Sequence, residues 1–196
     1  MSAGSSAAGA AVGLALLAGL ASGCGSNDAP AQGAADVSAA RQFKPFALYY
    51  AGPSFEELPL TNGGGDDVED SPRGPISFVY GTCEPEPGAE TSCAPPASIQ
   101  NFPICKENLS RYRGRARPRM LSLRGAPVAV FSDGSGAFEK VEVFAGRTTV
   151  ALWVDDVETA KRMIGELEPI NGRRRGRRLP PPPRGAVEGR RPACGD

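Results

Sequence analysis

The chain of 196 residues contains five cysteines and no histidine. The absence of histidine excludes the Ser-His-Asp and Cys-His nucleophile systems, zinc sites with histidine ligands and the commonest general base. No two cysteines have the C-x-x-C spacing that is typical of thiol redox sites. Carboxylate chemistry and disulfide formation are therefore the chemistries that this composition leaves open.

Carboxylates gather in two acidic stretches, NGGGDDVED at 62–70 and EPEPGAE at 84–90. Paired acids hydrolyse glycosides when they are held at a defined separation and burial raises one pKa. Both stretches are rich in Gly or Pro, which predicts solvated loops without such a geometry. We expect no catalytic residue and no enzymatic activity. An exported carboxylate-dependent hydrolase is the alternative, and a pair of buried acids lining one pocket would favour it.

The acids Asp66, Asp67, Glu69 and Asp70 also have the ligand type that hard cations prefer. Their spacing does not match the twelve-residue calcium loop, in which ligands alternate and a glutamate closes the site. We therefore expect solvated charge in a flexible loop over residues 61–75, with calcium binding as the lesser alternative. No metal site and no cofactor are predicted.

The N-terminal segment MSAGSSAAGAAVGLALLAGLASGC has an apolar run from Ala10 to Leu20. This run is shorter than the roughly 20 apolar residues that a membrane span needs, so it is typical of a signal peptide. The small residues 21–23 before Cys24 resemble the signal peptides of bacterial lipoproteins. That resemblance covers residues 1–24 and implies cleavage before Cys24, acylation of Cys24 and anchoring to the membrane. An ordinary cleavage site and simple secretion are the alternative.

Composition divides the rest of the chain into a tether, a domain and a tail. Residues 1–23 are the expected signal peptide, and residues 24–42 are the lipidated cysteine with a flexible tether that lacks apolar periodicity. Residues 43–170 contain the β-branched and aromatic residues of a single globular domain. Residues 171–196 are rich in Arg and Pro and include four consecutive prolines, which predicts a disordered tail.

Hydrophobic patterns predict the elements of the domain. Strands are expected at 43–50, 76–81 and 126–134, and alternating apolar residues on both sides of AGR predict a hairpin over 140–154. Apolar residues at helical spacing then predict an amphipathic helix within 155–172, with Asp155 or Asp156 as its N-cap. The expected fold class is α+β: a small, mainly antiparallel sheet of four to five short strands, one C-terminal amphipathic helix and disordered ends.

Four cysteines remain once Cys24 is lipidated, and an even number in an exported chain predicts disulfides. Three pairings of Cys83, Cys93, Cys105 and Cys194 can be drawn. The short polar loop between Cys83 and Cys93 favours that pair, which leaves Cys105 for Cys194. Cys105 could instead displace either partner of the first pair.

Two arginine-rich stretches, RYRGRARPR at 111–119 and the C-terminal tail, are the remaining charged features. The first has a single interleaved aromatic residue and matches no nucleic-acid-binding module, so we expect no nucleic-acid partner. The tail could contact an anionic surface of the envelope. The sequence thus predicts a lipid-anchored, non-catalytic binding or structural module on the outer face of the bacterial cytoplasmic membrane.

Overall fold

The computed structural model describes residues 35–70, 74–82, 94–112, 117–133, 135–172, 176–190 and 192–194. These residues belong to one unit that spans 32–196. The elements, in chain order, are α1 (Ser38–Gln42), β1 (Tyr49–Tyr50), β2 (Ser54–Phe55), β3 (Leu58–Asn62), α2 (Gly65–Asp70), β4 (Ile76–Tyr80), β5 (Ala97–Pro103), the 3-10 helix η1 (Leu109–Tyr112), β6 (Arg119–Leu123), β7 (Ala126–Ser132), β8 (Phe138–Ala145), β9 (Thr148–Trp153), α3 (Val157–Glu166) and β10 (Glu168–Pro169).

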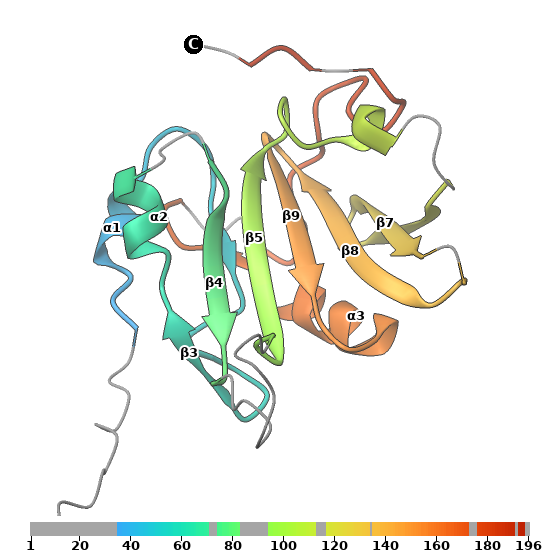
Figure 1. The fold of residues 1–196 in the computed structure, drawn as a ribbon. Helices are drawn as coiled ribbons and strands as arrows, with labels where there is room; N and C mark the ends of the chain where they lie inside the picture. Colours follow the sequence, from blue (N-terminus) through green and yellow to red (C-terminus); the bar gives the residue numbers. More distant parts are fainter. Residues whose placement is uncertain are drawn as a thin grey trace, which may run out of the picture. The chain divides into compact units, whose positions relative to one another are not determined.

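The main sheet has eight strands in the order β2-β3-β4-β5-β9-β8-β7-β6, and every neighbouring pair is antiparallel (Figure 1). A separate two-stranded ribbon joins β1 to β10. The α+β class and the mainly antiparallel sheet are confirmed. The expected number of four to five strands is wrong, because the sequence patterns predict β4, β7, β8 and β9 of this sheet but not β2, β3, β5 and β6. A buried asparagine interrupts the apolar pattern of β5, and β6 is an edge strand with exposed arginine and methionine.

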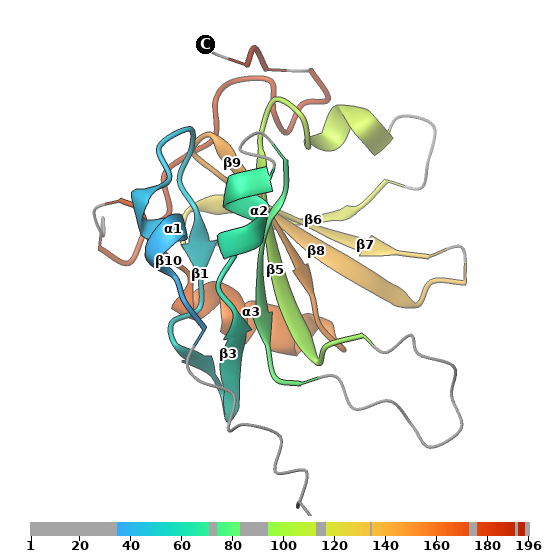
Figure 2. The same ribbon diagram turned by 60° about the vertical axis from the view of Figure 1, so that its left-hand side comes forward.

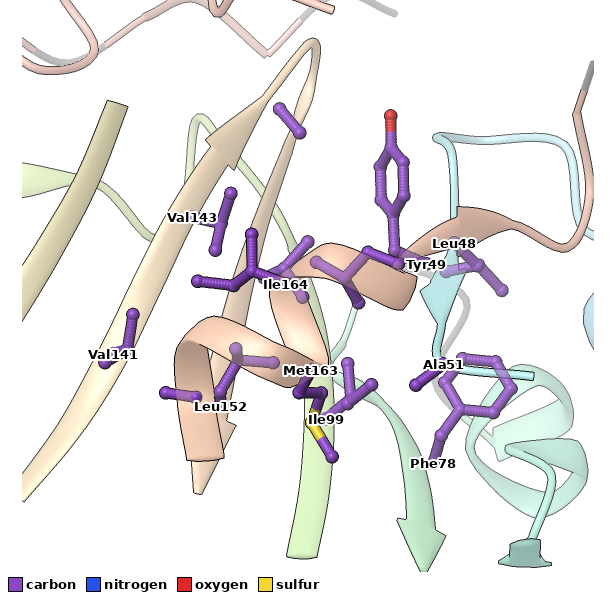
Figure 3. Packing of buried hydrophobic residues seen from close by; sticks show 14 of the residues in the cluster. Leu48, Tyr49, Ala51, Phe78, Ile99, Val141, Val143, Leu152, Met163 and Ile164 are labelled. Carbon is purple, nitrogen blue, oxygen red and sulfur yellow. The ribbon is translucent and has the colours of Figure 1, made fainter. Parts of the chain in front are cut away.

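The two faces of the sheet carry different cores, as the alternation along β8 shows. Val141 and Val143 belong to the larger core, which α3 and the segment around β1 cover (Figure 3). Phe144, which faces the other way, joins Phe131 and Ala186 in a second, smaller core. The sheet is therefore covered on both faces in this region, with α3 on one side and residues of η1 and the C-terminal segment on the other.

Helix α3 forms where the apolar periodicity predicts it. Asp156 is the N-cap, and its side chain accepts a hydrogen bond from the Thr159 backbone N–H at 2.8 Å. Ala160, Met163 and Ile164 are buried on the face that meets the sheet. The helix is thus held by its cap and by one apolar stripe.

The expected strand over 43–50 is reduced to Tyr49–Tyr50, and the preceding residues form irregular backbone. Buried Asn101 of β5 accepts a hydrogen bond from Tyr49 N and donates to Tyr49 O, at 2.8 and 2.9 Å. Helix α1 lies beside α2 (Figure 2), and Ala40 is fully buried. Residues 35–42 therefore belong to the folded unit rather than to the expected tether.

The acidic stretch 61–70 is also not the solvated loop that the sequence predicts. It forms the end of β3 and helix α2, and the intervening Gly63 and Gly64 are buried. Asp67 accepts a hydrogen bond from the Ser77 backbone N–H at 2.7 Å, which ties α2 to β4. A Cβ at Gly63 would overlap the carbonyl oxygen of Asp36, so the glycine permits a close approach of two backbone segments.

The expectation of a disordered tail is wrong for residues 176–190. Leu179 is buried in the larger core, and Ala186 is fully buried in the smaller one. Between them, the carbonyl oxygen of Pro180 accepts a hydrogen bond from Gly146 N in the β8–β9 turn at 2.8 Å. The segment thus passes the end of the hairpin and contributes to both faces of the sheet. None of the helices in the described ranges has the length and apolar character needed to cross a membrane.

Candidate functional site

The cysteines singled out in the sequence fall into two groups. Cys105, after β5, forms a disulfide with Cys194, and their Cα atoms are 5.1 Å apart. This is one of the pairs that the sequence left open. Cys24, Cys83 and Cys93 lie outside the described residues.

A cavity of about 510 Å³ lies where the C-terminal end of α3, the β6–β7 turn, the β8–β9 turn and the tail meet. Four arginines line it: Arg124, Arg147, Arg177 and Arg178. Its apolar wall includes Phe46, Leu167 and Pro180. This volume lies within the usual range for small-molecule sites. The cavity combines apolar surface with a predominance of cationic side chains.

Arg124 organises this cavity from the β6–β7 turn. Its φ of 52° lies in the left-handed region, as does the 79° of Gly125, which is the backbone pattern of a tight hairpin turn. Its Nη1 donates to the carbonyl oxygens of Ile164 and Leu167 at 2.9 and 2.6 Å, and its Nε donates to Arg177 O at 2.7 Å. Burial lowers the pKa of this guanidinium, which remains a cation at neutral pH.

The hydrogen bonds of Arg124 have an electrostatic consequence for the cavity. The last carbonyl groups of a helix carry partial negative charge and have no partner within the helix. Because Arg124 satisfies two carbonyls at the end of α3, this charge is neutralised where α3 borders the cavity. The remaining cationic groups are Arg147, Arg177 and Arg178, which make no ion pair with any described residue.

Two glutamates oppose these cations. Glu166, at the end of α3, is exposed, and Glu168 of β10 is half-buried and already engaged by another group. The lining therefore holds four arginines and two glutamates. Tyr49 adds a phenol ring to the wall, and its hydroxyl is directed away from the side chains of the apolar core (Figure 3). Such a site suits an anion rather than a cation.

A second cluster of titratable groups lies on the other face of the sheet, around Glu142 of β8. The Tyr112 hydroxyl lies 2.6 Å from Glu142 Oε1 and 2.8 Å from Glu107 Oε1. Lys140 Nζ donates to Glu142 Oε1 at 2.8 Å and to the Tyr112 hydroxyl at 2.7 Å. Arg111 forms an ion pair with Glu107. Two buried acids are thus brought together, which sequence reasoning did not foresee.

The environment of Glu142 opposes its ionised form. Its side chain is fully buried, and Oε2 has no hydrogen-bond partner among the described residues. Burial raises the pKa of Glu142, and the nearby Glu107 carboxylate raises it further, whereas Lys140 and Tyr112 lower it; the effect of burial is the largest. Burial likewise raises the pKa of the Tyr112 hydroxyl, and both neighbouring carboxylates add to the increase. The phenol therefore stays neutral.

Aromatic rings surround the ammonium group of Lys140. Its Nζ lies 5.1 Å from the ring centroid of Tyr112, and 5.3 Å from those of Phe131 and Trp153. These distances are within the range of cation–π attraction. The Lys140 ammonium group therefore contacts three aromatic rings and forms its ion pair with Glu142 at the same time.

Tyr49, Tyr80 and Asp66 lie at three different places in the structure. Tyr49 lines the arginine-lined cavity, whereas the buried Tyr80 hydroxyl accepts a hydrogen bond from Ala51 N at 2.7 Å. Asp66 lies beside a different surface depression near α1. No group of three or more metal-ligating side chains occurs within the described ranges.

Comparisons of the chain with protein-family models, with curated proteins and with solved structures found no match.

Proposed function

We propose that the chain is an exported, lipid-anchored protein of the bacterial cell envelope that acts as a non-catalytic binding or structural module. The observation that carries this proposal is the apolar run that ends in small residues directly before Cys24. The Cys105–Cys194 disulfide supports it, because disulfides persist mainly in oxidising compartments.

The described residues begin at residue 35, so the tether that such an anchor would use is shorter than the expected 24–42. The described part of the folded unit begins at residue 35, and eleven residues beyond Cys24 span at most about 40 Å when fully extended. An acylated Cys24 would therefore keep the folded unit within roughly one domain diameter of the membrane surface. A ligand of this module would be bound at or near that surface.

The buried acid pair is the observation that bears on the alternative, an exported hydrolase. Glu107 and Glu142 do lie close together, but only 5% and 0% of these residues is exposed. Tyr112 bridges the two carboxyl groups, and Lys140 and Arg111 neutralise them. A glycosidase needs its two acids on either side of a substrate-sized space. We therefore assign this pair a structural role and retain the non-catalytic proposal.

The experiment is mass spectrometry of the N-terminus of the mature protein, together with fractionation of cells that express the full chain. We expect an N-terminus at Cys24 that carries acyl chains, and recovery of the protein with membranes. More than one acyl chain is expected on Cys24, since a single acyl chain gives only marginal anchoring. Cys24→Ser should lose the lipid mass, whereas Ser26→Ala should be processed as the wild type is. An unmodified Cys24 in the mature protein would refute the anchoring proposal.

A further inference from the structure

We propose that the arginine-lined cavity is a binding site for a phosphate group. The inference rests on the proposed binding function and specifies its ligand. It is carried by the cavity of about 510 Å³ and by the three guanidinium groups of Arg147, Arg177 and Arg178 that border it. These groups make no ion pair with a described residue, so their donors are available to an anion.

The fold holds this site in place through contacts that do not involve the guanidinium groups of Arg147, Arg177 and Arg178. Arg124 fixes the tail by donating to the backbone oxygen of Arg177, and Leu179 N donates to Arg124 O at 2.9 Å. The next residue of the tail, Pro180, accepts a hydrogen bond from Gly146 beside Arg147. Three separate segments thus bring their arginines to one cavity through hydrogen bonds that are accepted by backbone oxygen atoms. The position of the site is therefore set before a ligand binds.

The chemistry of the donors favours phosphate over other anions. Each guanidinium group offers a planar fork of N–H donors that matches phosphate or carboxylate oxygens. Three such groups together supply more donors than one carboxylate accepts, whereas a phosphate presents three or four oxygens. The apolar wall around Phe46 and Pro180 would accommodate the carbon skeleton of a phosphate ester. The ligand class is thus a phosphate-bearing molecule, free or as a lipid headgroup.

Two variants of the full chain test the site by independent means. Arg177→Ala with Arg178→Ala removes two of the guanidinium groups but keeps the Arg177 backbone oxygen that Arg124 contacts. Gly165→Trp leaves the charge unchanged and places a large side chain at a helix position that borders the cavity, where a Cβ would lie more than 4 Å from every atom outside the neighbouring helix backbone. The matched control is Arg117→Ala with Arg119→Ala, which removes the same charge from exposed positions outside the cavity lining.

The probes are inorganic phosphate and glycerol 3-phosphate, titrated by calorimetry into the full chain carrying Cys24→Ser, and vesicles of phosphatidylcholine with or without phosphatidylglycerol. We expect each cavity variant to weaken binding at least tenfold and the control pair to change it less than twofold. Binding of the soluble phosphates alone assigns a free ligand, and retention on the anionic vesicles that requires Arg177 and Arg178 assigns a headgroup.

Two results would overturn this inference. One is that neither the soluble phosphates nor the vesicles bind. The other is equal weakening by the cavity and control pairs, which would show non-specific attraction to a basic surface. Thermal unfolding of each variant verifies that the fold is retained. Because these measurements use protein without the lipid, they fail or succeed independently of the anchoring experiment at Cys24.

Discussion

Replacing Glu142 by Gln should alter how the stability of the protein depends on pH. The side chain is fully buried, and burial raises the pKa of its carboxyl group above the value in the unfolded chain. The folded state therefore binds the proton more tightly than the unfolded state does. The stabilisation that results is complete below the unfolded pKa and is lost as the pH rises through the folded pKa. Glutamine has a similar shape but does not titrate.

The size of the effect follows from the linkage between proton binding and stability. Across the window between the two pKa values, wild-type stability should fall relative to Glu142→Gln by up to about 1.4 kcal/mol for each pH unit. Tyr112 contributes no slope, because burial and the neighbouring carboxylates raise the pKa of its hydroxyl and keep the phenol neutral.

The assay is denaturant unfolding at pH 4, 5.5 and 7 with the Cys105–Cys194 disulfide intact. The difference in unfolding free energy between the wild type and Glu142→Gln should move in favour of the variant as the pH rises. Glu139→Gln, at an exposed position of the same strand, should show no such trend. A flat difference for Glu142→Gln, or one that moves in favour of the wild type, would refute the assignment of a raised pKa to this group.

Two further predictions concern backbone constraints. The Cys105→Ser, Cys194→Ser double variant opens a loop that the disulfide closes over a sequence separation of 89 residues. The chain-entropy model then gives a loss of up to about 4.6 kcal/mol in the free energy of unfolding. Urea unfolding measures this loss, and an unchanged stability would exclude the disulfide. Gly63→Ala should lower the free energy of unfolding by more than about 1 kcal/mol, because its Cβ would overlap Asp36 O. The control is Gly65→Ala, where a Cβ meets open space. The melting temperature of Gly63→Ala should therefore fall further than that of the control.

The elements that could be predicted from sequence are those whose signals are local. The β8–β9 hairpin and α3 depend on contiguous residues with period 2 or 3.6, and both form where expected. Strand β5 was missed because one of its inward positions holds Asn101. That side chain is compatible with the core because its hydrogen-bond partners come from distant segments: the backbone of Tyr49, 52 residues away, and the backbone oxygen of Ile76. No local pattern contains this information.

The arginine-lined cavity could not be predicted for a related reason. Composition favours disorder for the tail, yet Leu179 and Ala186 supply single apolar contacts to two different cores. Each contact is isolated in sequence, so neither creates a periodic signal. The left-handed conformation of Arg124 is likewise favoured by the three hydrogen bonds of its guanidinium group rather than by its intrinsic preference. The site therefore arises from long-range contacts alone.

The buried acid pair did leave one signal in the sequence. Alternation along β8 places Val141 and Val143 on one face, and a strand in a one-sided sheet would then expose Glu142 to solvent. Phe144 lies two residues beyond Glu142 and so must share its face. A large aromatic residue on the polar face indicates that a second layer covers it. Once that layer is inferred, Glu142 must be buried with it, and a buried carboxylate requires partners such as Lys140 and Tyr112.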